Sequence, residues 1–368
     1  MALLSCVLFF NNSTLRNMQL ELTWDLISDQ EKRMLVDGTD KSSPFYYFVG
    51  NENAIKKVKV AAYSALGKKN RQMSELAFSV FGPSSSGKTK LPRTYADVVE
   101  LPYIEISPKA VKELKDVISH VEPVLENDNI PLKSPNNFYT IPPCIIFLDE
   151  VHALSNYMVQ GLLKATENQD GILATEDKNF YDCSKVTWFI ATTDEGKLFD
   201  AFRTRFTPIQ LRYLSRKEIS RIVYLSYSGL TESACDLVSH YNSRIPRKAL
   251  EFARYCKMYS EMYPELDIEQ VIHNVAKDEG IDEHGMRSEH FQVLCALQNG
   301  PVSKSRIGIV LNKKEEEVER YIMPWLLADT EDQSALVTVT NKGYVITDCG
   351  LEELRKRGVE NEKVSEVE

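Results

Sequence analysis

The sequence predicts an α/β protein in which a domain built on a parallel sheet with flanking helices precedes two smaller units. Three observations support this fold class. An apolar run of strand length, 76–81, leads into a glycine-bounded loop, and a second apolar run, 141–148, ends at Asp149 and Glu150. From about residue 215 the pattern is helical, and the last part is typical of three helices followed by a hairpin, 285–355.

The loop after the first apolar run has the phosphate-binding P-loop pattern G-x-x-x-x-G-K-T. Its two glycines allow backbone angles that point successive N–H groups at phosphate oxygens, and the following helix adds its positive end. Lys88 is expected to reach the β- and γ-phosphates, and the Thr89 hydroxyl to hold Mg²⁺. The alternative is a flexible Ser/Gly surface loop, which does not explain a full motif behind a strand. The predicted nucleotide-binding residues here are Gly82, Pro83, Ser84, Ser85, Ser86, Gly87, Lys88, Thr89 and Lys90.

The second apolar run is continuous, which is typical of a strand buried on both faces of a parallel sheet. Its carboxyl end carries Asp149 and Glu150, at the edge where ligands bind in open α/β sheets. Asp149 is placed to hold Mg²⁺ through water, and Glu150 to polarise the water that attacks the γ-phosphate. The alternative is an exposed acidic strand end. The preceding P-loop favours the catalytic interpretation.

A third buried strand, 186–191, is followed by Thr192 and Thr193. A polar side chain at this strand end can contact the γ-phosphate or orient water, and the alternative is a threonine that caps the turn. Downstream, Arg203 and Arg205 stand among aromatic residues. They could be solvated or paired internally, or they could serve the phosphate of a neighbouring subunit, since a planar guanidinium suits developing charge.

The helical segment from Ser215 to about Gly280 is predicted to be a small lid domain. Arg247 follows Pro246 in the first turn of one of its helices, where the helix dipole disfavours a cation. This position favours a ligand role facing phosphate.

Composition limits the class of protein. The chain has 368 residues with 43% hydrophobic and 26% charged residues, as in an ordinary globular protein. Its seven cysteines are scattered without a C-x-x-C pair, which favours a reducing, cytoplasmic compartment. The apolar start, residues 1–10, has no basic leader and is interpreted as a strand or buried terminus, and no stretch is long enough to span a membrane.

The predicted organisation has five parts: an N-terminal extension (1–43), a large P-loop domain (44–212), a helical lid (213–282), a winged-helix domain (283–355) and a charged tail (356–368). The net charge of −9 argues against bulk attraction to nucleic acid. Residues 285–355 hold 8 basic against 11 acidic residues, which is not a basic footprint. The winged helix could therefore bind DNA or dock another protein.

From about Phe45 to Leu354 the chain resembles AAA+ ATPases, and more closely the RuvB-type motors that drive Holliday-junction branch migration. The P-loop matches Walker A and residues 145–154 match Walker B, but all AAA+ proteins share these motifs. The resemblance to RuvB rests on an A-T-T sensor (191–193), an R-x-R-F segment (203–206), a P-R-x-A sequence (246–249) and a terminal winged helix, in that order.

The resemblance implies ATP and Mg²⁺ as cofactors and a homo-oligomeric ring, hexameric in the family. It implies that Thr193 is the sensor 1 residue and Arg205 the arginine finger, with Arg203 in reserve. It also implies that Arg247 is the sensor 2 arginine, and that Tyr213 lies near the family's nucleotide-contacting tyrosine. The family's RuvA partner binds a hairpin that is short and polar here (171–185), so the sequence does not predict that partnership.

Three functions remain open. The first is ATP-driven movement of DNA, as in branch migration or DNA unwinding during recombination and repair. The second is an AAA+ loader or remodeller of a protein complex, with the winged helix as a docking module. The third, a nucleotide-gated scaffold with little turnover, is disfavoured because Lys88, Asp149 and Glu150 are all present.

Overall fold

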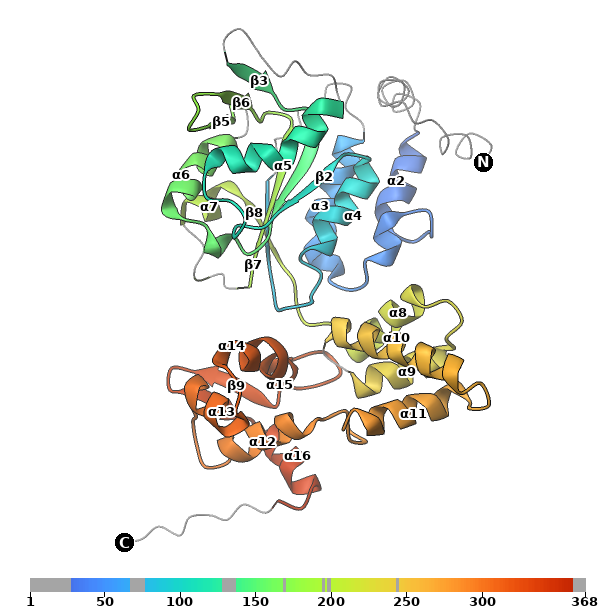
Figure 1. The fold of residues 1–368 in the computed structure, drawn as a ribbon. Helices are drawn as coiled ribbons and strands as arrows, with labels where there is room; N and C mark the ends of the chain where they lie inside the picture. The colour runs from blue at the N-terminus through green and yellow to red at the C-terminus, as the bar shows by residue number, and fades with distance from the viewer. Residues whose placement is uncertain are drawn as a thin grey trace. The chain divides into compact units, whose positions relative to one another are not determined.

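The computed structural model describes residues 28–66, 77–127, 137–167, 170–193, 196, 200–242 and 245–359. The chain divides into two compact units (Figure 1). The first comprises residues up to Leu211 except Pro83–Ser86, and the second comprises Pro83–Ser86 and the residues from Arg212 on. The prediction for residues 1–27 lies outside the described residues, whereas 29–37 form a helix.

The first unit is built on a parallel sheet with the strand order β2-β4-β7-β1-β8. Its strands are β1 (Phe78–Phe81), β2 (Tyr103–Ile106), β4 (Cys144–Leu148), β7 (Val186–Thr192) and β8 (Thr207–Gln210). All residues of β1, β4 and β7 are buried, as predicted from their continuous apolar runs. The sequence interpretation missed β8, a short edge strand in which only Ile209 is buried.

Helices cover both faces of this sheet (Figure 1). Alternate residues of β4 point to opposite sides: Ile146 and Leu148 join the core with α5, α6 and α7, whereas Ile145 and Phe147 join the core with α3 and α4. The helices of this unit are α2 (Asp29–Asp37), η2 (Pro44–Tyr47), α3 (Glu52–Ala65), α4 (Lys90–Val99), α5 (Leu114–Asn127), η4 (Val151–Ala153), α6 (Asn156–Ala165) and α7 (Asp200–Arg205).

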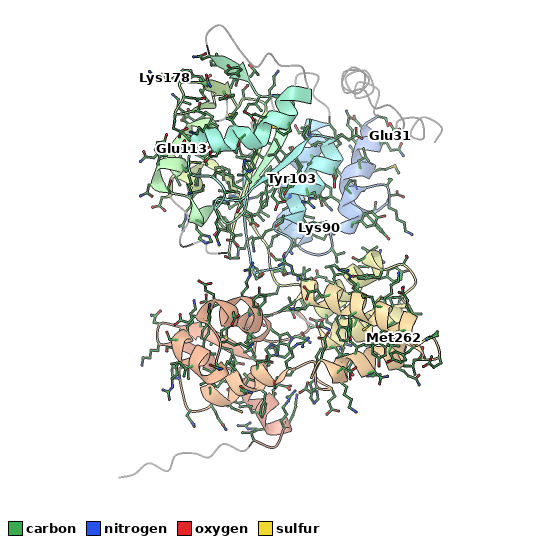
Figure 2. The ribbon with its side chains drawn as sticks, in the orientation of Figure 1. Glu31, Lys90, Tyr103, Glu113, Lys178 and Met262 are labelled. Atoms are coloured by element: carbon green, nitrogen blue, oxygen red, sulfur yellow. The ribbon has the colours of Figure 1, made fainter. Side chains whose placement is uncertain are left out.

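A second, three-stranded sheet has the order β3-β6-β5. The predicted hairpin forms from β5 (Ile172–Ala174) and β6 (Phe180–Asp182), with Lys178 in its turn (Figure 2). A third strand, β3 (Phe138–Thr140), joins β6 in parallel. Phe138 pairs in register with Phe180, and these two side chains are 45% and 42% exposed. The surface of this sheet is therefore not simply polar.

The second unit begins with four helices around one core, in agreement with the predicted lid. They are α8 (Arg216–Ser226), α9 (Glu232–Tyr241), α10 (Pro246–Met262) and α11 (Ile268–Asp278). Ser215 caps α8 and forms a capping box with Glu218, which satisfies backbone donors at the helix start. Pro246 occupies the first turn of α10, where its missing N–H costs nothing.

The remaining elements form the predicted winged-helix pattern around a separate core. They are α12 (Ser288–Leu297), α13 (Lys304–Leu311), α14 (Glu315–Glu317), the π-helical turn η6 (Val318–Ile322), α15 (Met323–Leu327), β9 (Val337–Thr340), β10 (Gly343–Ile346) and α16 (Asp348–Lys356). Helix α16 occupies part of the predicted domain and the start of the predicted tail. Within the described ranges, no helix has the length and apolar character needed to cross a membrane.

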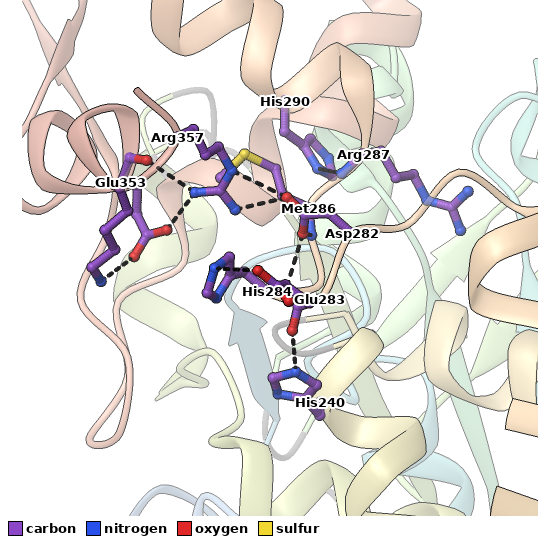
Figure 3. Close-up of polar contacts among 10 residues, drawn as sticks. His240, Asp282, Glu283, His284, Met286, Arg287, His290, Glu353 and Arg357 are labelled. Atoms are coloured by element: carbon purple, nitrogen blue, oxygen red, sulfur yellow. Dashed lines mark hydrogen bonds and ion pairs between the residues drawn. The ribbon is translucent and has the colours of Figure 1, made fainter. Parts of the chain in front are cut away.

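The connection between lid and winged helix is held by polar contacts (Figure 3). Asp282 accepts hydrogen bonds from the backbone N–H groups of His284 and Met286, at 3.0 and 2.8 Å. Arg357 donates to the same carboxylate, and His240 Nε2 lies 2.6 Å from the Glu283 carbonyl oxygen. Gly285 has a φ of +78°, and a Cβ there would lie 2.6 Å from the His240 carbonyl, so this position requires glycine.

Candidate active site

The P-loop leaves β1, which lies between β7 and β8 in the parallel sheet, and enters α4. Gly82 and Gly87 have φ angles of 151° and 104°, and Ser85 adopts a left-handed φ of 64°. A Cβ on Gly87 would lie 3.1 Å from the Phe48 ring, so both space and backbone angle require glycine. The buried Ser86 hydroxyl has no hydrogen-bond partner among the described residues. An orphaned donor in this loop fits a nucleotide phosphate, since buried polar groups ordinarily have partners.

The P-loop lysine directly precedes the N-cap of α4, and Lys90 is the first residue of that helix. The Lys88 side chain is buried, and its Nζ donates to the Gly82 carbonyl oxygen at 3.0 Å. Thr89 is the N-cap residue of α4, but its hydroxyl does not cap the helix. Lys90 points elsewhere, since its Nζ lies 2.5 Å from the Tyr47 carbonyl. Thus Lys88 and Thr89 fit the predicted phosphate and Mg²⁺ roles, whereas Lys90 secures the helix to η2.

Asp149 and Glu150 follow β4, two strands away from the P-loop strand. Burial raises the pKa of Asp149, the neighbouring Glu150 carboxylate raises it further, and Lys88 opposes both effects. A half-buried carboxylate beside a lysine and a second carboxylate is a site where a divalent cation would relieve repulsion. The donor set of Asp149 with Thr89 therefore fits Mg²⁺.

Glu150 is linked to the end of β7. The backbone N–H and the hydroxyl of Thr193 donate to Glu150 Oε2, at 3.1 and 3.2 Å. His152 Nδ1 lies 3.3 Å from the same oxygen and 2.9 Å from the Thr192 hydroxyl. The structure thus brings together the predicted base Glu150 and the predicted sensor Thr193. It adds His152 and Thr192, to which the sequence interpretation gave no catalytic role.

The two candidate arginine fingers lie on α7. Arg205 Nη1 donates to the Leu163 carbonyl at the end of α6 and lies 3.3 Å from Glu167 Oε1. Its side chain is 34% exposed. Arg203 Nε lies 4.0 Å from Asp200, whose side chain is almost fully exposed. Within one chain, Arg205 is therefore held by the end of α6.

Tyr213 and Arg247 belong to the second unit. Tyr213 is half-buried, and burial raises its pKa. Arg247 is exposed in the first turn of α10, as its sequence position suggested. The roles of Tyr213 and Arg247 at the nucleotide stay predictions.

Residues 78–213 match the family described as ATPase family associated with various cellular activities, AAA. This segment contains the parallel sheet, the P-loop and the acidic strand end. The fold around it is that of RuvB. The chain aligns with Thermotoga maritima RuvB, named as a Holliday junction branch migration motor, with a TM-score of 0.63 and 20% identity over 84% of this chain and 95% of that one.

A second structure, a variant of Thermotoga maritima RuvB, gives a TM-score of 0.65 at 19% identity, with the same coverage of 84% and 95%. A comparison with curated protein sequences gave no match. The likeness confirms the predicted fold class: an AAA+ core, a helical lid and a C-terminal winged helix. At 19–20% identity the likeness shows the fold.

Proposed function

We propose that this protein is an ATP-hydrolysing motor that moves DNA, most specifically a RuvB-like motor for branch migration of Holliday junctions in recombination and repair. One observation supports this most directly: Glu150, held by Thr193, stands at the carboxyl edge of a P-loop sheet within a RuvB fold. The same edge carries Lys88 and Asp149, so phosphate-binding, metal-binding and basic groups converge where an α/β sheet binds ligands.

In this proposal, Lys88 and the P-loop N–H groups bind the phosphates of ATP. Thr89 and Asp149 would hold Mg²⁺, which supplies positive charge against the phosphate oxygens when bound. Glu150 accepts a proton from the attacking water, and Thr193 orients the Glu150 carboxylate. Arg205 completes the site of a neighbouring subunit in a homo-oligomeric ring, which we take to be hexameric, and Tyr213 and Arg247 contact the nucleotide from the lid.

A loader or remodeller of a protein complex is the second candidate. It is favoured by the surface of the winged helix, where Ile309 and Val339 are 78% and 63% exposed. The segment from Glu315 to Glu319 also carries four glutamates, which repel a phosphate backbone. In that case the winged helix binds protein instead of DNA, although the ATPase chemistry is the same. In either case we place the protein in the cytoplasm.

The test is ATP hydrolysis measured without DNA, with duplex DNA and with a four-way junction, at two salt concentrations. Branch migration predicts strong stimulation by the junction that weakens with salt. Hydrolysis indifferent to every DNA would overturn the motor proposal and leave the remodeller. The exposed side chains of Phe138 and Phe180 form an apolar surface that a partner protein could bind. Each assay is therefore repeated with a RuvA-type protein.

Two variants assign the hydrolysis to this site. Glu150→Gln should retain ATP binding and lower kcat by about 10²–10⁴-fold, the usual contribution of a general base. Lys88→Ala should weaken ATP binding itself, because it removes a phosphate contact. Arg93→Ala serves as the control, since Arg93 forms a surface ion pair with Glu105 on α4 and β2. Unchanged hydrolysis in Glu150→Gln would place the base elsewhere.

A further inference from the structure

The short turn after β4 brings a histidine to the predicted base. Glu150 has a left-handed φ of 55°, and Val151–Ala153 then form the helical turn η4. This conformation is unfavourable for a non-glycine residue and is typically retained at functional sites. It places His152 Nδ1 within 3.3 Å of Glu150 Oε2. Two residues separated by one position in the sequence therefore share one polar contact.

His152 is also tied to β7. Its Nδ1 lies 2.9 Å from the hydroxyl oxygen of Thr192, a residue that is buried within the strand. The His152 side chain is itself mostly buried, at 27% exposure. The next residue, Thr193, donates two hydrogen bonds to the same Glu150 oxygen. The His152 ring thus connects the end of β7 to the turn that follows β4.

Within the described ranges, every polar contact of the Glu150 carboxylate converges on Oε2. An ionised carboxylate only accepts hydrogen bonds. Oε2 is therefore anchored, and Oε1 is the oxygen oriented to accept a proton from water. Anchoring of one oxygen fixes the direction of the other, which is what a general base requires.

We propose that His152 is a positioning residue for Glu150, with its Nδ1 setting the direction of the carboxylate against Thr192. This inference rests on the proposed role of Glu150 in ATP hydrolysis. With the proton on Nδ1, His152 donates to Glu150 Oε2 and holds it. With the proton on Nε2, Nδ1 accepts from the Thr192 hydroxyl and repels the carboxylate, so the tautomer selects a held or a released Glu150.

The decisive substitutions are His152→Asn, His152→Gln and His152→Leu. The asparagine amide nitrogen falls near the position of Nδ1, whereas the glutamine amide falls near Nε2. We expect His152→Asn to keep kcat within about threefold of the wild type. His152→Gln and His152→Leu should lower kcat by about 10–100-fold with KM for ATP unchanged, because misorientation of a catalytic group affects the chemical step.

Two controls separate positioning from folding. His120→Asn changes a histidine on α5 whose Nδ1 contacts the Asp116 carbonyl oxygen, so it should not affect kcat. Thr192→Val removes the anchor of His152, and its effect should not add to that of His152→Leu. Equal kcat values for the Asn and Gln variants, or a change confined to KM, would overturn the inference. Melting temperatures of each variant identify any that is unfolded.

A measurement without ATP keeps this inference separate from the proposed function. The ¹⁵N chemical shift of His152 Nδ1, in selectively labelled protein, should change when Glu150 is replaced by Gln, because the contact is lost or weakened. The same shift in both proteins would refute the His152–Glu150 contact whatever the hydrolysis results. If the wild type shows the expected shift change but hydrolyses no ATP, the proposed function fails while the contact stands.

Discussion

Arg357, just after α16, forms an ion pair with Asp282 in the connection between the lid and the winged helix. Its Nε and Nη2 donate to Asp282 Oδ2 at 3.1 and 2.8 Å, and its Nη1 donates to Glu353 at 2.6 Å. The Arg357 side chain is 14% exposed. Burial lowers the pKa of Arg357, but the hydrogen bonds to Glu353 and Asp282 outweigh this effect. The pKa of Arg357 is therefore raised. The residue that follows α16 is thus bound to the segment that precedes α12.

Arg357→Gln should destabilise the second unit by about 1–3 kcal/mol, because it removes the charged donor that Asp282 and Glu353 share. Faster proteolysis between residues 281 and 287 and a lower unfolding midpoint in urea would report this. Asp282→Asn retains the acceptor for His284 and Met286 but loses the ion pair, so its effect should not add to that of Arg357→Gln. Arg355→Gln, on the exposed side of α16, is the control. Equal stability of all four proteins would contradict the prediction.

Arg205 is expected to act across subunits. Arg205→Ala should lower ATP hydrolysis by about 10³–10⁵-fold, the usual effect of losing an arginine finger. Mixing Arg205→Ala with Glu150→Gln subunits should restore part of the activity, since some interfaces then combine an intact Arg205 with an intact Glu150. The measurement is hydrolysis against mixing ratio. No recovery at any ratio, with rings formed, would assign Arg205 to its contacts with Leu163 and Glu167 alone.

Ionised Asp149 should lower the free energy of unfolding at neutral pH. Its folded pKa lies above the ordinary value because of burial, so ionisation is less favourable in the folded state. Protonated Asp149 makes its full contribution to the free energy of unfolding below the ordinary aspartate pKa. That contribution is lost as the pH rises through the pKa that Asp149 has in the folded protein. Asp149→Asn should therefore melt a few degrees higher than the wild type at pH 7, with a smaller difference near pH 4.

Mg²⁺ gives a second readout for the same substitution. Because a bound cation relieves the repulsion at Asp149, Mg²⁺ with nucleotide should raise the melting temperature of the wild type more than that of Asp149→Asn. The variant should also lose hydrolysis. A lower melting temperature of Asp149→Asn at pH 7 would show that the carboxylate stabilises the fold.

The buried cysteines should resist alkylation. Burial raises the pKa of Cys183 and that of Cys256 to about 12, so little thiolate exists near pH 8. Mass spectrometry after brief iodoacetamide treatment should find both unmodified in the folded protein and modified in urea. The half-buried Cys349 should react sooner. Rapid modification of Cys183 in the folded state would show that the core beside β6 opens readily.

Local sequence was sufficient for much of the fold. The continuous apolar runs predicted β1, β4 and β7, and the helical pattern from Ser215 to about Gly280 predicted the segment that holds the lid helices. Edge strands were harder to predict, because β8 and β3 are short and bury few residues. Helix α16 was missed because a charged, amphipathic segment near the chain end resembles a tail until its apolar side contacts the winged-helix core.

Some residues of the candidate site could be predicted from the sequence, and others could not. The P-loop and the Asp149–Glu150 pair are continuous in the sequence, and phosphate binding by backbone N–H groups needs only that local pattern. His152 could not be recognised, because its spacing from Glu150 has no meaning until the left-handed turn brings the side chains together. The contact between Arg205 and Glu167 likewise joins α7 to the end of α6.

The sequence by itself determined the class of fold and the phosphate-binding loop, since both follow from hydrophobic patterning and local backbone conformation. Only the tertiary structure decided how Glu150, His152, Thr192 and Thr193 share one network. The physical reason is the parallel register, in which Leu148 of β4 lies opposite Ile190 of β7. That register sets the ends of two strands about forty residues apart in the sequence beside each other, and directional hydrogen bonds form only across such a contact.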